Sequence, residues 1–392
     1  MDFSLDDEQR ALSDSVRRWC DSNAPAERRG NRLDAAAAAT LRDGLAGLGL
    51  TGLALPEQYG GSGLSSVELM LTAQELGRAL VDGDWFASAV LGGPLLASAG
   101  AAHQQARWLP DVASGALRLA VALHEEAARY DWTRTATRAR ATASGYLLDG
   151  SKQLVIQGES ADLFLVLARL SGQPGERAGL GLLAVPRDCA GLTVRGFDTL
   201  DNRRAAHLEL RAVSVPADHL IGAAAGEPAD AATPATDPLA TAEVVEATLA
   251  RACAVLCGEA AGALDALLAQ TIEHLRSRQQ FGQPLARFQA LQHRLADLFG
   301  AVEQVKSLAC AAALAADGSD RRARARICAA AKVLAGQLGR EAGLTAIQMH
   351  GAMGMTDECR IGHYAKRLMV INSLCGDARH HLQTVARLAA TP

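Results

Sequence analysis

The spacing of apolar residues divides the chain into a helical part, a β part and a second helical part. Near the start, Leu12, Val16 and Trp19 recur at positions i, i+4 and i+7, which is one face of an amphipathic helix. Another helix is expected over residues 65–80, after a loop rich in Pro and Gly. The pattern predicts a helical first domain over residues 1–118.

In residues 119–235 the apolar residues recur at the shorter spacing that is typical of β-strands. Leu208, Leu210 and Ala212 alternate with polar residues, which is typical of a half-buried strand. Short apolar runs bounded by turn residues are expected to be further strands. These are residues 163–168, residues 180–185 and a strand from Gly145 that ends in an Asp149–Gly150 turn. We therefore expect a middle antiparallel β-barrel domain.

Helical periodicity returns in residues 236–392, after a stretch at 222–238 that is rich in Ala, Pro and Gly and is expected to be a linker. Long helices are predicted over residues 241–269 and 322–348, and long helices with short loops favour a bundle. The fold class is therefore α+β, with an N-terminal helical domain, a middle antiparallel β-barrel domain and a C-terminal four-helix bundle.

Composition excludes several classes of protein. The net charge of −4 and the pI of about 6.2 argue against a nucleic-acid partner, which would require a basic surface. No run approaches the ~18 apolar residues of a membrane span, and the acidic start lacks the apolar core of a signal peptide. The eight cysteines form no CxxC pair and have no metal-spaced histidine, so no metal site is predicted. We expect a cytoplasmic protein in which Cys253 and Cys257 are buried helix residues.

Three segments carry sequence motifs. Residues 56–61 read Pro-Glu-Gln-Tyr-Gly-Gly. Residues 274–289 contain Arg278, Gln280, Phe281 and Gly282 and end in Phe288 and Gln289, and residues 348–355 read Gln-Met-His-Gly-Ala-Met-Gly-Met. They resemble the N-terminal loop, the R-x-Q/T-F-G…F-Q motif and the Q-x-H-G-G-x-G motif of the acyl-CoA dehydrogenase family. The domain order matches as well, so the resemblance spans the whole chain.

The resemblance implies an FAD-dependent oxidoreductase acting on CH–CH bonds. Its reaction would be the α,β-dehydrogenation of an acyl-CoA, and its electrons would pass to electron-transferring flavoprotein. In the family the second and third motifs hold the adenosine and pyrophosphate half of an FAD whose flavin ring lies mainly in the neighbouring subunit. The guanidinium of Arg278 offers a planar cationic fork, and Gly351 lets the backbone approach a phosphate. The cofactor contacts expected by resemblance are Arg278, Gln280, Phe281, Phe288, Gln289, Gln348, Met349, His350, Gly351 and Gly354.

The usual catalytic base is missing. The family has a Glu in a Y-E-G-T segment, and Cys375 stands at its place. Some branches place the base on the first helix of the last domain, here near Arg251, where the nearest carboxylates, Glu246 and Glu259, are more than a turn away. A thiolate base would require a lowered pKa. Asp377 is a second alternative, since relatives that oxidise nitroalkanes use an Asp, although its position also suits a helix N-cap.

Two further positions concern the last helix and the packing of the C-terminal domain. His380 and His381 are expected on the last helix, at the surface or an interface. Small side chains over residues 249–262 are consistent with room for a bulky acyl group or with close helix packing, and both interpretations stay open.

The segments expected to face the flavin also depart from the family pattern. Where the family reads T-E-P-x-A-G-S-D, this chain has Arg129 and Tyr130 in place of the small G-S turn. Where it reads K-x-W/F-I-T/S-N, the aromatic is Leu154 and the hydroxyl residue is Ile156. Isoleucine cannot form a hydrogen bond, so a buried flavin edge would be left unpaired at a cost of about 1–3 kcal/mol.

The departures separate two halves of the family's FAD site. The half that reaches a neighbour is kept, and the half that holds the chain's own flavin is lost together with the base. This predicts one subunit of an α2β2 acyl-CoA dehydrogenase with about one FAD per heterodimer, whose catalytic partner carries the Glu. Such complexes in bacteria act on steroid side-chain CoA esters, which favours a bulky acyl group. Two alternatives remain: a self-sufficient flavin oxidase or monooxygenase, and a non-catalytic structural subunit.

Overall fold

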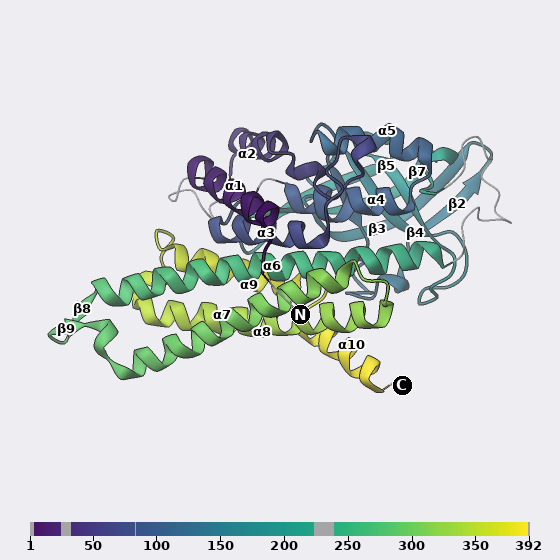
Figure 1. Ribbon diagram of the computed structural model, residues 1–392. Helices are drawn as coiled ribbons and strands as arrows, with labels where there is room; N and C mark the ends of the chain where they lie inside the picture. The colour runs from purple at the N-terminus through teal and green to yellow at the C-terminus, as the bar shows by residue number, and fades with distance from the viewer. Residues whose placement is uncertain (1–3, 25–32, 83, 223–238, 391–392) are drawn as a thin grey trace.

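The computed structural model describes residues 4–24, 33–82, 84–222 and 239–390. Helices come first, a β domain follows and long helices end the chain. In Figure 1 the long C-terminal helices form one layer, and the N-terminal helices and the β domain lie side by side upon it. The predicted α+β class and order of domains are confirmed.

The N-terminal helices begin where side chains cap their unpaired N–H groups. Asp6 accepts a hydrogen bond from the backbone N–H of Gln9 (2.8 Å), and the Gln9 side chain bonds back to Asp6. Ser65 and Glu68 form the same reciprocal capping box at the next long helix. The helices are α1 (Asp7–Asn23), α2 (Ala35–Gly47), α3 (Ser66–Ala79), α4 (Gly93–Ala99) and α5 (Ala102–Ala113), with a π-helical turn at Phe86–Gly92.

The middle domain is a seven-stranded sheet in the order β1-β4-β2-β3-β7-β6, with β5 paired to β4. β1 runs parallel to β4, and β2 also meets β4 in parallel, whereas the other pairs are antiparallel. The domain expected to be antiparallel is therefore mixed. Its strands are β1 (Leu119–Ala122), β2 (Arg138–Thr142), β3 (Gly145–Ile156), β4 (Leu163–Arg169), β5 (Leu180–Pro186), β6 (Leu192–Asp198) and β7 (Arg204–Pro216).

The Asp149–Gly150 turn predicted from the sequence is wrong. β3 continues through both residues to Ile156, with an irregular register between Leu148 and Gly150. The Asp149 side chain accepts a hydrogen bond from the backbone N–H of Ala212 on β7 (2.8 Å). Pairing with β7 on both sides of this bulge outweighs the local preference of Asp-Gly for a turn.

The C-terminal domain is a bundle of long helices. Both predicted long helices are present and extend further than expected. The linker predicted at 222–238 lies outside the described residues except for Gly222. The elements are α6 (Ala240–Ser277), β8 (Gln279–Gln280), β9 (Gln283–Pro284), α7 (Gln289–Ala316), α8 (Arg321–His350), α9 (Arg360–Ser373) and α10 (Ala378–Ala390).

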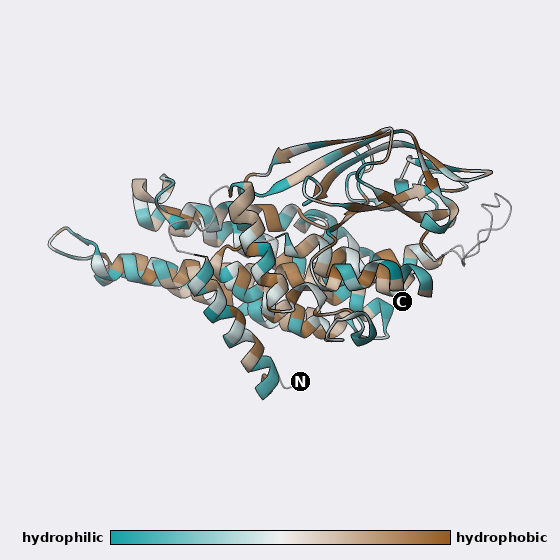
Figure 2. Ribbon diagram, turned by 90° about the horizontal axis from the view of Figure 1, so that it is seen from above, coloured by the Kyte–Doolittle hydropathy of each residue, from teal (hydrophilic) through white to brown (hydrophobic). Residues whose placement is uncertain are grey.

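Helices α3 and α6 approach each other closely because glycines line their contact. A Cβ added at Gly262 would lie 1.7 Å from the backbone oxygen of Gln74, and one at Gly258 would lie 2.6 Å from the backbone oxygen of Met70. The small side chains of residues 249–262 therefore serve close helix packing, and this decides the alternative that the sequence left open. Figure 2 shows brown, apolar positions along the helices of this bundle.

Within the part of the chain that the structure describes, two helices, α6 and α7, are long and apolar enough to cross a membrane by length and composition. The sequence expectation that no stretch approaches this limit is therefore wrong. The most apolar 18-residue window of α6 is 83% buried inside the protein, and that of α7 is 39% buried. Core helices of globular domains pass the same test.

Candidate functional site

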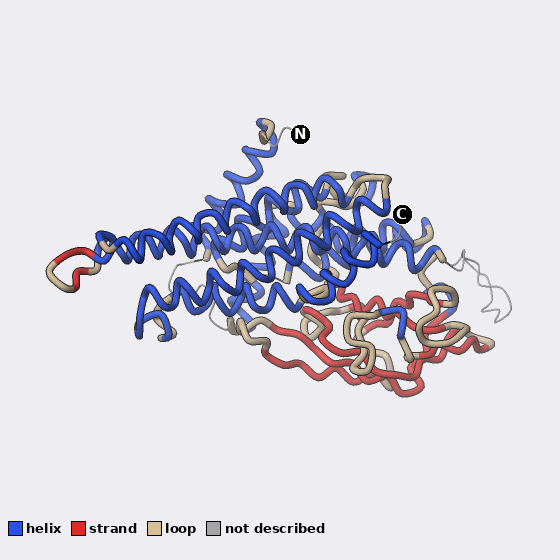
Figure 3. The backbone as a smooth tube through the Cα atoms, turned by 90° about the horizontal axis from the view of Figure 1, so that it is seen from below, coloured by secondary structure: helices blue, strands red, loops and turns tan. Residues whose placement is uncertain are grey.

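Arg278 ends helix α6 and begins a projecting hairpin. Its backbone N–H donates to the carbonyl of His274 (2.9 Å) and closes the last helical turn. β8 and β9 then pair, and a 3-10 turn leads to Phe288. We call residues 278–288 the arm. Figures 1 and 3 show its hairpin projecting beyond the end of the helical bundle.

A cation and an exposed aromatic ring share the arm. Phe281 is 87% exposed at the tip, and its ring meets that of Phe288 edge to face at 6.0 Å. Arg278, Gln280 and Gln289 are exposed as well. A guanidinium fork suits a phosphate, and a flat ring suits an aromatic base. The arm therefore offers the two kinds of contact that an adenosine pyrophosphate requires.

The third motif turns the chain at the end of α8. Gly351 has φ 65, a conformation that glycine adopts without strain. Gln348 and Gly351 are exposed, whereas Met349, His350 and Gly354 are buried. The exposed pair is placed to touch a ligand. The buried residues are also among the cofactor contacts that the resemblance implies, and in the isolated chain they expose little surface.

Two histidine rings bring these motifs together. His274, one turn before Arg278, stacks on His350, directly before Gly351, with ring centroids 4.2 Å apart and an angle of 22°. The ends of α6 and α8, which are far apart in the sequence, are thus in direct contact.

The flavin-facing positions lie in a small cavity between the β domain and α9. Leu154 and Ile156 line it from β3, and Val370 and Leu374 line it from the end of α9. We call the contact between the β domain and the end of α9 the crease. Its cavity holds about 20 Å³, which is room for a single water molecule. Cofactor pockets usually measure roughly 300–1,000 Å³, so this cavity, as it stands in the isolated chain, is too small for a flavin ring.

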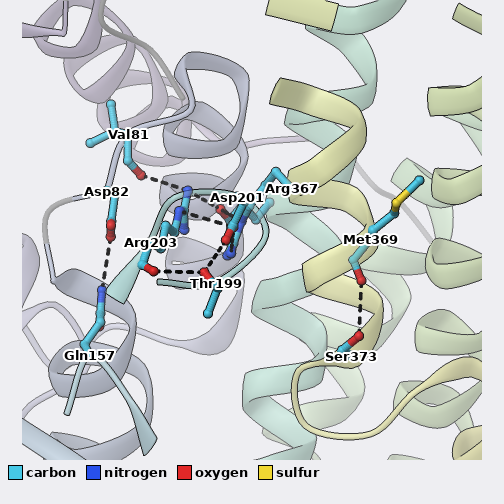
Figure 4. A network of polar contacts seen from close by, with 10 residues as sticks. Val81, Asp82, Gln157, Thr199, Asp201, Arg203, Arg367, Met369 and Ser373 are labelled. Atoms are coloured by element: carbon cyan, nitrogen blue, oxygen red, sulfur yellow. Dashed lines mark hydrogen bonds and ion pairs between the residues drawn. The ribbon is translucent and has the colours of Figure 1, made fainter. Parts of the chain in front are cut away.

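A buried network of charges crosses the crease. Arg367 on α9 donates to both oxygens of Glu259 on α6 (2.7 and 2.6 Å) and to Asp201 before β7 (2.8 Å). Arg203 lies 3.0 Å from Glu259 and donates to the carbonyl of Val81 (3.1 Å). Figure 4 shows Arg203 and Arg367 converging on Asp201 from opposite sides. The network ties all three domains together.

The protonation states in this network follow from its pairing. Burial acts to raise the pKa of Glu259, but the charges of Arg367 and Arg203 outweigh it and hold this pKa below its usual value. The pKa of Asp201 is lowered in the same way, against the effect of burial. Glu259 is therefore a paired carboxylate and not a poised base. Sequence reasoning missed the network, although charged residues such as Arg367 within apolar helical segments are the signal for it.

Cys375 lacks the properties of a thiolate base. Burial of its thiol raises the pKa to about 12, whereas reactive thiols have a lowered pKa. Its φ is 55, and its carbonyl accepts hydrogen bonds from the Cys253 thiol (3.8 Å) and from His381 Nε2 (3.0 Å). Asp377 accepts from the backbone N–H of His380 (2.8 Å) and so caps α10. The Asp377 carboxylate therefore has a structural role as the cap of α10.

Aromatic rings close the crease beside these residues. Tyr130, in the loop after β1, lies 5.5 Å from His380 and 6.2 Å from His124, measured between ring centroids. His380 in turn meets His381, which is 8% exposed. Of the two places expected for His381, the surface is therefore excluded, whereas an interface is not tested. Arg129, with φ 50, directs the chain into this contact.

Glu125 and Lys152 anchor the loop that carries Tyr130. The Lys152 ammonium is fully buried and lies 2.7 Å from the Glu125 carboxylate, which also accepts from the hydroxyl of Thr137 (2.7 Å). Burial lowers the pKa of Lys152 to about 8. The pair joins β3 to the loop after β1, which carries Tyr130.

Comparison with known proteins identifies the class. Three family models match: Acyl-CoA dehydrogenase, N-terminal domain, at residues 6–116; middle domain at 120–213; and C-terminal domain at 242–389. The probable acyl-CoA dehydrogenase YngJ of Bacillus subtilis (strain 168) is 32% identical over 316 residues, which are 79% of each chain. This chain belongs to the acyl-CoA dehydrogenase family, whose members are oxidoreductases.

Two of the similar solved structures are described by the names of two proteins each. A chain of a variant of the Tcur3481–Tcur3483 steroid ACAD is 28% identical, with a TM-score of 0.81 and 98% coverage of both chains. A chain of the ChsE4–ChsE5 complex from Mycobacterium tuberculosis is 25% identical, with a TM-score of 0.82 and complete coverage of both.

FAD is the cofactor of this family, and the two candidate regions of this chain fit it differently. The arm and the Gly351 turn present an exposed guanidinium and an open backbone, which suit the pyrophosphate. The crease encloses a cavity of only about 20 Å³, which is smaller than a flavin ring. In the isolated chain the arm and the Gly351 turn are thus open to a ligand, whereas the crease is largely filled by side chains.

Proposed function

We propose that this chain is the flavin-free subunit of a heteromeric, FAD-dependent acyl-CoA dehydrogenase. Its arm and Gly351 turn bind the adenosine and pyrophosphate of an FAD whose ring is held by a catalytic partner. The observation that carries the proposal is the closed crease, whose cavity of about 20 Å³ lies between Leu154, Ile156 and Leu374. A self-sufficient flavin oxidase or monooxygenase would need a ring site there.

The two subunits contribute different groups, as the side chains of this chain indicate. The partner supplies the carboxylate base and the acyl pocket, and its FAD accepts the hydride. In this chain Glu259 is held as a paired carboxylate, the pKa of Cys375 is raised to about 12, and Asp377 caps α10. The role of the chain is therefore to bind and orient the cofactor through Arg278.

The similar heteromeric structures support an α2β2 assembly and favour a bulky, steroid-like acyl group, because one of them is a steroid ACAD. We propose electron-transferring flavoprotein as the acceptor and the cytoplasm as the location, as the resemblance implies. The acyl group would lie in the partner, because the glycines of α6 in this chain are used for packing against α3.

Co-expression with a neighbouring acyl-CoA dehydrogenase gene tests the proposal. The purified complex is expected to carry about one FAD per heterodimer. Arg278→Ala should weaken FAD binding about 10- to 100-fold, since hydrogen bonds to charged groups contribute roughly 1.5–3 kcal/mol. Arg195→Ala, on β6 with its side chain 73% exposed, removes the same charge far from the arm and should change nothing. Unchanged FAD content with Arg278→Ala would mean a purely structural subunit, and a fully flavinylated homotetramer would overturn the proposal.

A further inference from the structure

The contact between His274 and His350 connects the helix that leads into the arm with the helix that leads into the Gly351 turn. His350 is the last residue of α8 and is 9% exposed. Its Nδ1 lies 2.9 Å from the carbonyl oxygen of Ala346. A carbonyl only accepts, so Nδ1 carries the hydrogen and the orientation of the ring is fixed. His274, on the last turn of α6, lies against this fixed ring at 4.2 Å and 22°.

Each histidine is directly connected to a residue expected to contact the cofactor. The carbonyl of His274 accepts the hydrogen bond of the Arg278 N–H (2.9 Å), which sets the point where the arm leaves α6. His350 is followed by Gly351, whose φ of 65 turns the chain away from α8. A shift of one ring against the other would therefore move the arm relative to the Gly351 turn.

We propose that His274 is a positioning residue for FAD: by stacking on His350 it holds Arg278 and the Gly351 turn in the relative position that lets both reach one pyrophosphate. The inference rests on the proposed function and adds a residue that the family motifs do not assign to the cofactor. Rigid support of this kind is what a binding site requires when its contacts come from different elements.

The electrostatic surroundings are consistent with the stack. Burial, His350 and the charge of Arg278 all lower the pKa of His274. Burial also lowers the pKa of His350. Both rings are therefore neutral at pH 7 and stack without mutual repulsion.

The test measures FAD dissociation constants of the co-expressed complex. His274→Ala is expected to weaken FAD binding about three- to tenfold, the range expected for loss of one aromatic pair. His274→Phe keeps a flat ring and should restore the affinity to within about twofold. His207→Ala is the matched control, because His207 stacks on Phe197 in the β domain at 4.5 Å and 19°, away from the arm. The melting temperature of each variant reports whether it folds.

The outcomes separate this inference from the proposed function. If Arg278→Ala weakens FAD binding and a folded His274→Ala does not, the inference is wrong and the proposed function stands. If His274→Phe binds FAD as weakly as His274→Ala, stacking is not the cause and the inference is also wrong. If neither Arg278→Ala nor His274→Ala changes FAD binding, the proposed function itself fails.

Discussion

The ring of Tyr130, after β1, lies 5.5 Å from the ring of His380 on α10, so the β domain and the last helix touch directly across the crease. The same crease is crossed more deeply by the ion pairs of Arg367 with Glu259 and Asp201. Aromatic and ionic contacts thus join the domains at the positions that the family resemblance places beside the flavin. The stability of the chain should therefore depend on the residues that meet there.

Arg367→Met should destabilise the chain by about 3–5 kcal/mol, because it leaves the carboxylates of Glu259 and Asp201 buried without their main partner. Urea unfolding at pH 7 measures this free energy. Arg321→Met is the control, since the Arg321 side chain is 51% exposed and pairs with Glu243 and Glu246 at the surface. It should cost less than about 1 kcal/mol. Equal losses in the two variants would show that the buried network contributes no more than a surface pair.

The closed crease should be sensitive to acid. Burial, followed by the charge of Lys152, lowers the pKa of His124 to about 4, and burial, followed by the charge of Lys332, lowers that of His381 to about 3. An unfolded histidine titrates near 6.5. The folded state therefore binds fewer protons, and the stability that these neutral rings provide is complete above pH 6.5 and is lost as the pH falls toward 4 and 3.

Hydrogen exchange at pH 7 and pH 4.5 measures this effect. The loop around Tyr130 and the start of α10 should lose protection in acid before the sheet does. A double variant, His124→Gln with His381→Gln, should show a smaller difference between the two pH values. Equal protection of the loop at both pH values in the unmodified chain would contradict the assignment.

The thiol of Cys375 should be unreactive in the folded chain. Burial raises the pKa of its thiol to about 12, so alkylation of the folded chain at pH 8 should be slow compared with that of an unfolded cysteine. Cys375→Ala should leave the dehydrogenation rate of the complex within about twofold, because the thiol takes no part in proton removal. A large loss of kcat in a folded variant, with KM unchanged, would instead make Cys375 a catalytic residue.

Gly262→Ala should strongly destabilise the chain, because its Cβ would lie 1.7 Å from the backbone oxygen of Gln74 and would force α3 and α6 apart. We expect a loss of at least about 2 kcal/mol, in the range of overpacked cores. Gly300→Ala, within α7, meets nothing within 4 Å and should be neutral or stabilising by up to about 1 kcal/mol. Thermal unfolding of the two variants checks both signs. Tolerance of Gly262→Ala would reopen the interpretation of this segment as an acyl pocket.

Sequence reasoning succeeded where a local pattern determines the structure. The repeat of apolar residues predicted long helices over 241–269 and 322–348, and the structure has them within α6 and α8. It failed where distant segments decide. The Asp149–Gly150 turn was overridden by pairing with β7, and nothing local shows that Arg367 meets Glu259 or that Tyr130 meets His380. Met349 and His350 belong to a recognisable motif, but only the fold shows that they are buried.

The most direct measurement is the visible absorption spectrum of the purified chain, alone and then in complex with a co-expressed acyl-CoA dehydrogenase partner. The closed crease predicts a colourless lone chain, even after incubation with FAD, and a yellow complex with about one FAD per heterodimer. A lone chain that is yellow, with FAD bound in equimolar amount, would contradict the account, because the ring would then occupy the space between Leu154 and Leu374.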